Sequence, residues 1–330
     1  MNPILLHQKI ISWTRAFFIN RGFEEFNVPL LHPSLPLEPN LYSFETIHHS
    51  LQSKNRLYLS TSPESSLKKN IAKTRLSKVF SISHSFRDRE GESPIHQQEF
   101  LMVEWYRLNA DYNQIMKDSQ NLILFTKKKI DSYLKRPLSA SFRFKSQNID
   151  LSVPWPKLSL IDLFDKYSRI DLLSVLDNNA LFDIAQKRKY ALFSNTRWEE
   201  IFNQIYLNDI FPNLPFSPFF LTDFPSRISP LARKNKNNTH ISDRFELIIA
   251  KIELGNGNAE NTDSDAIHKS FSKEQEFRQK EKIISPTTDD NFISALKSLS
   301  SHTFSGMGLG IDRLSMLLQN INHIKDLYIR

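Results

Sequence analysis

The chain has no cysteine, few glycines and no long hydrophobic run among its 330 residues. Without cysteine it forms neither disulfide bonds nor thiolate metal sites, which is typical of a protein from a reducing compartment. The apolar N-terminus is interrupted by His7, Lys9 and Arg15, and no apolar stretch approaches the length of a membrane span. We therefore expect a soluble, cytoplasmic protein that has no membrane partner.

Glycine is rare, yet five of the 7 glycines lie in two short segments, 255-GNG-257 and 306-GMGLG-310. Glycine costs backbone entropy in an ordered element and is normally kept where no side chain fits. In a strand, alternation places the glycines of 306–310 on one face, which offers a flat floor for a ligand. Asp312 and Arg313 then open a helix, whose N-terminus is a place where anions bind. A glycine-rich core strand would explain the glycines but not the exposed Asp-Arg pair.

The composition is that of a globular protein with 40% hydrophobic residues and a formal net charge of +7. A chain of this length buries one large core or two modest ones. Its positive charge favours an anionic partner such as a nucleotide, a nucleic acid or an acidic protein, although the basic residues are spread along the chain.

Hydrophobic periodicity predicts strands in hairpins and helices that are separate from them. Helices are predicted at 4–21, 111–134, 265–283 and 289–299 and from Arg313, and another within 56–72, with Ser62 as its N-cap and Pro63 as its first residue. Strands are predicted at 23–31, 79–87, 99–107, 244–254 and 306–310. This pattern favours an α+β fold with an antiparallel sheet flanked by helices. The segment 135–240 mixes Pro- and Phe-containing pieces with helical ones and gives no clear prediction.

The predicted hairpin of 79–87 and 99–107 carries the first candidate site. Alternation places Phe100, Met102, Glu104 and Tyr106 on one face and Leu101, Val103 and Trp105 on the other. If the second set is core, Glu104 stands on an exposed floor between two aromatic rings, where a carboxylate suits a cation or an amino group. At the loop mouth, Arg87, Arg89, Glu90 and His96 include side chains suited to phosphate. The alternative is a solvated hairpin tip.

The second candidate site consists of two glutamates within 244–254, Glu246 and Glu253. On one straight strand they would point to opposite faces. A tight turn near Ala250 and Lys251 would fold the segment into a hairpin and bring both carboxylates to one end. Converging carboxylates repel unless a cation lies between them, and oxygen ligands are those that Mg²⁺ prefers. The alternative is two unrelated surface glutamates.

Taken together and in this order, these segments resemble the catalytic domain of class II aminoacyl-tRNA synthetases. The lysyl branch is the most similar, through 61-TSPE-64, 104-EWYR-107, 229-SPLAR-233, 243-DRFEL-247, 253-ELGNG-257 and 306-GMGLGIDRL-314. The resemblance implies one catalytic domain over 1–330, without an anticodon-binding OB-fold and with 135–240 as an inserted or variable helical region. It also implies a homodimer whose interface is reached by the strand around Pro29.

The same resemblance implies the ligands and the site residues, with ATP and Mg²⁺ as cofactors. On the ATP side, Arg87 binds the α-phosphate, Phe100 and Arg313 sandwich the adenine, and His96 touches the terminal phosphate. Glu90 and Gly310 are further ATP-binding residues, and Glu246 and Glu253 hold Mg²⁺. On the amino-acid side, Glu64 takes the α-ammonium, Asn256 the carboxylate, and Glu104, Tyr106 and Glu260 the side-chain ammonium, beside Gly308. Arg87 and Arg313 are the implied catalytic residues, because positioning and electrostatics carry the reaction.

A lysyl-type catalytic domain with 104-EWYR-107 after the arginine hairpin is similar to the branch that modifies elongation factor P. That branch activates β-lysine as an adenylate and transfers it to a lysine of elongation factor P. The resemblance therefore implies elongation factor P as the partner of the chain. Gly308 stands where the branch commonly has alanine, and Asn258 and Asn261 replace an aromatic and an aliphatic residue, so the choice between α- and β-lysine stays open. The alternatives are aminoacylation of tRNA and a non-catalytic paralogue that binds an amino acid.

Overall fold

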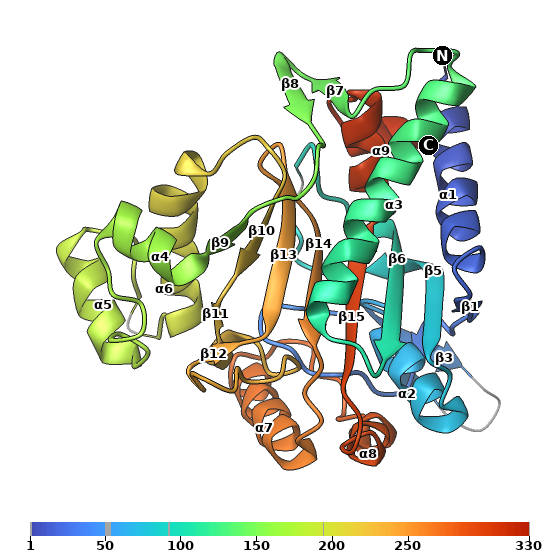
Figure 1. Ribbon diagram of the computed structural model, residues 1–330. Helices are drawn as coiled ribbons and strands as arrows, with labels where there is room; N and C mark the ends of the chain where they lie inside the picture. The colour runs from blue at the N-terminus through green and yellow to red at the C-terminus, as the bar shows by residue number, and fades with distance from the viewer. Residues whose placement is uncertain (1, 50–53, 92, 194, 330) are drawn as a thin grey trace.

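The computed structural model describes residues 2–49, 54–91, 93–193 and 195–329, and a mostly antiparallel sheet of eight strands runs through its centre (Figure 1). The strand order is β1-β5-β6-β15-β14-β13-β10-β9. Their bounds are β1 (Glu24–Glu25), β5 (Lys78–Phe86), β6 (Glu99–Leu108), β9 (Lys157–Ser159), β10 (Phe219–Thr222), β13 (Arg244–Ile249), β14 (Ile252–Ala259) and β15 (Phe304–Gly310). Only the outermost pairs, β1 with β5 and β9 with β10, are parallel. The predicted fold class is confirmed.

Smaller sheets and helices surround this sheet. The short strands are β2 (Leu31–His32), β3 (Glu45–His49) and β4 (Lys54–Leu59) in one sheet, β7 (Ser141–Phe144) with β8 (Gln147–Asp150), and β11 (Phe224–Pro225) with β12 (Ile241–Ser242). The helices are α1 (Pro3–Ile19), α2 (Glu64–Thr74), α3 (Tyr112–Tyr133), α4 (Leu160–Leu163), α5 (Asn178–Lys187), α6 (Trp198–Ile205), α7 (Ser264–Lys280), α8 (Asp290–Ser298) and α9 (Ile311–Gln319). No helix in the described part of the chain has the length and hydrophobicity that a membrane crossing requires.

The two faces of the sheet are covered differently (Figure 1). Helices α1, α3 and α9 pack on one face, over a core that contains Leu101, Val103, Trp105, Met307 and Leu309. The alternation predicted for 99–107 is therefore correct on its core side. On the other face, α2, α7 and α8 cover only the end of the sheet near Tyr106 and Phe304. The rest of that face is left for a cavity.

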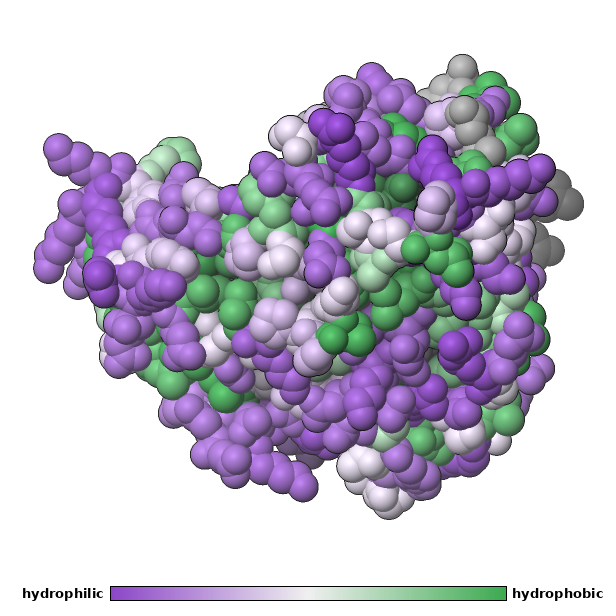
Figure 2. Space-filling model, turned by 45° about the horizontal axis from the view of Figure 1, so that its top comes forward, coloured by the Kyte–Doolittle hydropathy of each residue, from purple (hydrophilic) through white to green (hydrophobic). Residues whose placement is uncertain are grey.

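The segment 135–240 does not stand apart from the sheet, because β9 and β10 form its edge. The helices α4, α5 and α6 make a lobe beside them with a core of its own, which includes Phe164, Trp198 and Phe202. Strand β10 joins the two cores, since Phe219 packs in the lobe and Phe220 in the main core. Figure 2 shows the lobe at the left, separated from the rest of this face by a hollow.

Three predicted boundaries are wrong. The strand predicted at 23–31 is reduced to β1 and β2, because Pro29 lacks an N–H and the chain leaves β5 after the Phe26 N–H binds the Phe80 carbonyl. Helix α2 begins at Glu64, with Pro63 rather than Ser62 in the N-cap position. Helix α9 begins at Ile311 instead of Arg313, since the extended backbone of Gly310 already caps it.

Candidate active site

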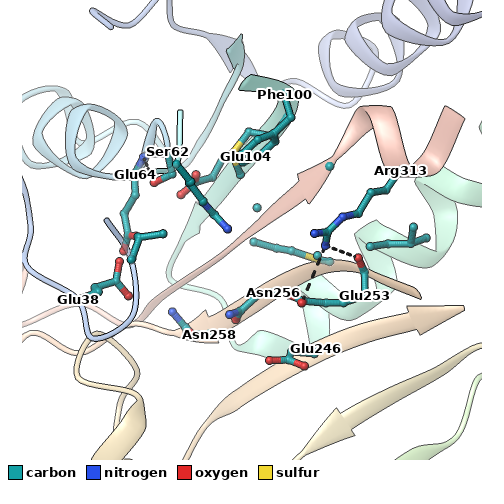
Figure 3. A pocket seen from close by; sticks show the side chains of 18 of the residues that line it. Glu38, Ser62, Glu64, Phe100, Glu104, Glu246, Glu253, Asn256, Asn258 and Arg313 are labelled. Carbon is teal, nitrogen blue, oxygen red and sulfur yellow. Dashed lines mark hydrogen bonds and ion pairs between the residues drawn. The ribbon is translucent and has the colours of Figure 1, made fainter. Parts of the chain in front are cut away.

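One cavity of about 450 Å³ lies on the open face of the sheet. Every residue predicted for the site lines it: Glu64, Arg87, Glu90, His96, Phe100, Glu104, Tyr106, Glu246, Glu253, Asn256, Glu260, Gly308, Gly310 and Arg313. These side chains come from distant parts of the sequence and point toward a shared space (Figure 3). The structure thus brings the predicted set together, and the role of each member stays a prediction.

The glycines of β15 make room for side chains of the neighbouring strand β6. In the antiparallel register, Gly306 lies opposite Tyr106, Gly308 opposite Glu104 and Gly310 opposite Met102, and directly opposed residues share a face. A Cβ on Gly306 would lie 2.2 Å from the Tyr106 ring, and one on Gly308 would lie 2.6 Å from the Met102 Cε. The bare floor expected for a ligand is therefore partly occupied by protein side chains.

This packing predicts unequal costs for alanine along β15. Gly306→Ala should lower the free energy of unfolding by about 1–3 kcal/mol, because the Tyr106 ring is buried and has to move. Gly310→Ala is the matched control, since its nearest atoms belong to Arg313 at 3.8 Å, an ordinary contact. Urea unfolding of both variants gives the comparison. Equal stability of the two would show that the ring moves at no cost.

A buried lysine that the sequence analysis missed binds two of the glutamates predicted to hold the amino acid. Lys68 on α2 has a fully buried side chain, and its Nζ donates to Glu64 and, at 2.5 Å, to Glu260. Burial alone would lower the pKa of Lys68, but the charges of Glu260 and Glu64 outweigh it and raise the pKa. Lys68 follows Glu64 by four residues in a predicted helix, so an i, i+4 ion pair was a signal that could have found it.

Glu104 differs from its prediction. It was expected on an exposed floor, but it is only 3% exposed, because α2 and the loops around the cavity cover this face as well. Its Oε1 accepts a hydrogen bond from the Tyr106 hydroxyl at 2.5 Å, while its Oε2 has no hydrogen-bond partner among the described residues. Burial, reinforced by the charge of Glu64, raises the pKa of Glu104 to about 8. An unpartnered carboxylate oxygen of this kind suits an ammonium ligand.

The raised pKa of Glu104 gives a pH prediction. The carboxyl binds its proton up to about pH 8 in the folded protein but only to its ordinary 4.5 in the unfolded chain, so this group's stabilising contribution is lost as pH rises between these values. The lowered pKa values of His32 and His96 make the stability rise with pH instead, but only below pH 6.5, which is the ordinary pKa of histidine. From pH 6.5 to 8 we therefore expect unfolding free energy to fall more steeply in the wild type than in Glu104→Gln, as measured by urea denaturation. Parallel pH profiles of the unfolding free energy for the two proteins would contradict this prediction.

Two arginines line the part of the cavity that is predicted to bind phosphate. The Arg87 guanidinium lies over the Phe100 ring, 5.1 Å from its centroid, and 3.6 Å from a Glu90 oxygen. Arg313 donates to the Glu253 carbonyl at 2.8 Å (Figure 3) and to the Ile95 carbonyl at 3.2 Å. Both guanidinium groups thus line the cavity and retain donors for a polyanion.

His96 lines the same part of the cavity, on the loop between β5 and β6. Its Nδ1 pairs with the Ser93 hydroxyl at 2.7 Å, and its Nε2 is 3.9 Å from Glu90. Burial, followed by the charge of Arg313, lowers the pKa of His96. A neutral imidazole can donate one hydrogen bond to a phosphate oxygen without adding charge. Glu92 of this loop lies outside the described residues.

The predicted hairpin with Glu246 and Glu253 is confirmed. Ala250 and Lys251 form its turn with φ of 54° and 59°, the left-handed pair of a two-residue β-hairpin turn. The register shifts by one residue, so that Glu246 faces Asn256 whereas Ile248 faces Glu253. Its pairing with Ile248 puts Glu253 on the face that Glu246 occupies, and the bulge at Leu254 puts Asn256 on the same face, although residues three apart would otherwise point to opposite faces.

The two carboxylates of the hairpin differ in their surroundings. Glu246 is paired with Arg244 at 2.8 Å and its side chain is 14% exposed, while the Glu253 side chain is 44% exposed. Burial, followed by the charge of Glu253, raises the pKa of Glu246 to about 7. No group of three or more His, Asp or Glu in the described chain forms a complete metal site. Two carboxylates on one face nevertheless fit Mg²⁺, which takes its remaining oxygen ligands from phosphates and water.

Comparison with known proteins places these features in a family context. The profile of the family described as tRNA synthetases class II (D, K and N) matches residues 1–329. The lysine–tRNA ligase of Buchnera aphidicola subsp. Schizaphis graminum is 33% identical over 322 residues, which cover 97% of this chain and 61% of the relative. That of Carboxydothermus hydrogenoformans is 30% identical over 325 residues, with 98% and 64% covered. The chain thus spans about three fifths of the length of these relatives.

Proposed function

The chain belongs to the class II tRNA synthetases of the D, K and N type, and we propose that it activates lysine or β-lysine with ATP and transfers it to a lysine side chain of elongation factor P. One observation carries the proposal. One cavity is lined by Arg87 and Arg313 and by the carboxylates of Glu64, Glu104 and Glu260, so that it presents charges of both signs. This polarity suits a triphosphate beside a substrate that has two amino groups.

In the proposed first step, a carboxylate oxygen of the amino acid attacks the α-phosphorus of ATP and pyrophosphate leaves. Arg87 and Arg313 stabilise the negative charge that develops on the phosphate oxygens. Asn256 orients the attacking carboxylate, and the glutamates fix both ammonium groups, so the reacting atoms are held in line. Glu246 and Glu253 would hold Mg²⁺, which neutralises phosphate charge when bound.

In the second step, the amine of the acceptor attacks the carbonyl carbon of the adenylate and AMP leaves. An amide forms if the acceptor is a protein lysine. The resemblance of 104-EWYR-107 and the preceding hairpin to the elongation factor P branch supports this acceptor. The names of the relatives, lysine–tRNA ligases, favour a second candidate, in which the acceptor is a tRNA hydroxyl and an ester forms.

The decisive experiment separates activation from transfer. Amino-acid-dependent ATP–pyrophosphate exchange, run with a panel that includes α-lysine and β-lysine, should give activity with one or both isomers. Transfer is then followed with radiolabelled amino acid on purified elongation factor P and on total tRNA. Label that resists mild base identifies the amide, whereas an ester is hydrolysed. Exchange with no member of the panel would leave only the non-catalytic reading, and label on tRNA alone would select the second candidate.

A further inference from the structure

Glu38 is an acidic residue of the cavity that no sequence motif marks. It lies on the segment between β2 and β3 and lines the cavity beside Glu64 (Figure 3). Its backbone is held firmly, because its carbonyl oxygen accepts a hydrogen bond at 2.7 Å from Arg278, which is 1% exposed. The same guanidinium also binds the Leu41 carbonyl at 2.9 Å. The segment is thereby fixed against α7, with the Glu38 carboxylate directed at the cavity.

The charge of Glu38 is left without a partner of its own. No lysine, arginine or histidine of the described chain lies within ion-pair distance of its carboxylate, whereas the buried cation nearby, Lys68, is bonded to Glu64 and Glu260. Burial, followed by the charge of Glu64, raises the pKa of Glu38 to about 7. Two neighbouring carboxylates in a partly buried place favour either a proton or a shared cation. The cavity supplies space for such a cation on the amino-acid side.

We propose that Glu38 is a second ligand for the substrate's backbone amino group, which it holds together with Glu64. This inference rests on the proposed function, because it assumes that the substrate enters with its amino group at this wall. It adds a residue that determines specificity. The amino groups of α- and β-amino acids differ in position by about one carbon–carbon bond, roughly 1.5 Å, and a pair of carboxylates can hold an ammonium group at either position.

The test measures whether Glu38 is coupled to that amino group. Binding of α-lysine, β-lysine and 6-aminohexanoate, which lacks the backbone amino group, is measured by calorimetry for the wild type and for E38Q. We expect E38Q to weaken the binding of at least one lysine isomer by tenfold or more, because a hydrogen bond to a charged group is lost. Binding of 6-aminohexanoate should change less than twofold. The difference between the effects of E38Q on lysine and on 6-aminohexanoate then measures the coupling between Glu38 and the backbone amino group, as in a thermodynamic cycle. E38D, which keeps the charge, should bind more tightly than E38Q.

The controls separate a ligand from a structural role. E45Q removes a carboxylate on β3 that is paired with Arg56 and does not line the cavity, so it should leave all three affinities unchanged. The KM for ATP should change less than twofold in E38Q, because a Glu38 that only orients Arg87 or Arg244 would alter ATP binding. Equal weakening of lysine and 6-aminohexanoate, unchanged lysine binding in E38Q, or no lysine binding by the wild type would each overturn the inference. Exchange activity of the wild type reports separately on the proposed function.

Discussion

Replacing Arg313 with alanine is expected to lower kcat/KM for ATP–pyrophosphate exchange by about 10²–10³-fold, the usual effect of removing one preorganised donor to a charge that develops in the transition state. Arg313 is placed for this role by rigid elements. It lies in the first turn of α9, after the Gly310 cap, and its guanidinium is anchored to the Glu253 carbonyl of β14. The side chain therefore needs little reorganisation when a phosphate arrives.

The Arg313 prediction has two controls. Arg313→Lys keeps the charge but not the planar fork, and it should recover only part of the activity. Arg136→Ala removes an exposed arginine outside the cavity and should leave exchange unchanged. Thermal unfolding of all variants checks the fold, since Arg313 is 22% exposed and its loss should cost little stability. A loss of less than tenfold in Arg313→Ala would place the triphosphate elsewhere.

The parts of the site that could be predicted from sequence are those that depend on strand geometry. Alternation in 99–107 separates Trp105 from Glu104, and the rare glycines mark a strand that needs close neighbours. The turn at Ala250 and Lys251 follows from the need to bring Glu246 and Glu253 together. Each of these inferences uses a period of two residues and a short segment, so no knowledge of the tertiary fold is required.

Other parts of the site depend on contacts that no local pattern encodes. Glu38 lies in an irregular segment, and a buried arginine of α7 holds its backbone at the cavity. The burial of Glu104 results from α2 and the loops above β6, which sequence alternation cannot place. The bulge at Leu254 puts Asn256 on the same face as Glu253, and nothing in 253-ELGNG-257 marks where the extra residue would be accommodated.

Lys68→Met is expected to lower the free energy of unfolding by about 3–5 kcal/mol at pH 8, the usual cost of removing one partner from a buried ion pair. Methionine fills much of the volume, but Glu64 and Glu260 then face each other without a cation. The loss should be smaller at pH 5.5, because burial already raises the pKa of Glu260 and a proton can replace the lost charge. Adding Glu260→Gln to Lys68→Met should recover most of the stability at pH 8, whereas additive losses would contradict the pairing.

A second buried pair shows whether Lys68 also matters for substrate binding. Lys127 and Asp131 form an i, i+4 ion pair on α3, with side chains 7% and 5% exposed, and neither lines the site cavity. Lys127→Met should therefore cost stability through the same loss of a cation, while the affinity for lysine stays unchanged. Lys68→Met should alter that affinity as well, because Glu64 and Glu260 lose the group that fixes their orientation, and Glu260 acquires a proton that a diammonium substrate has to displace. If calorimetry gives equal lysine affinities for the two variants, Lys68 serves the fold alone.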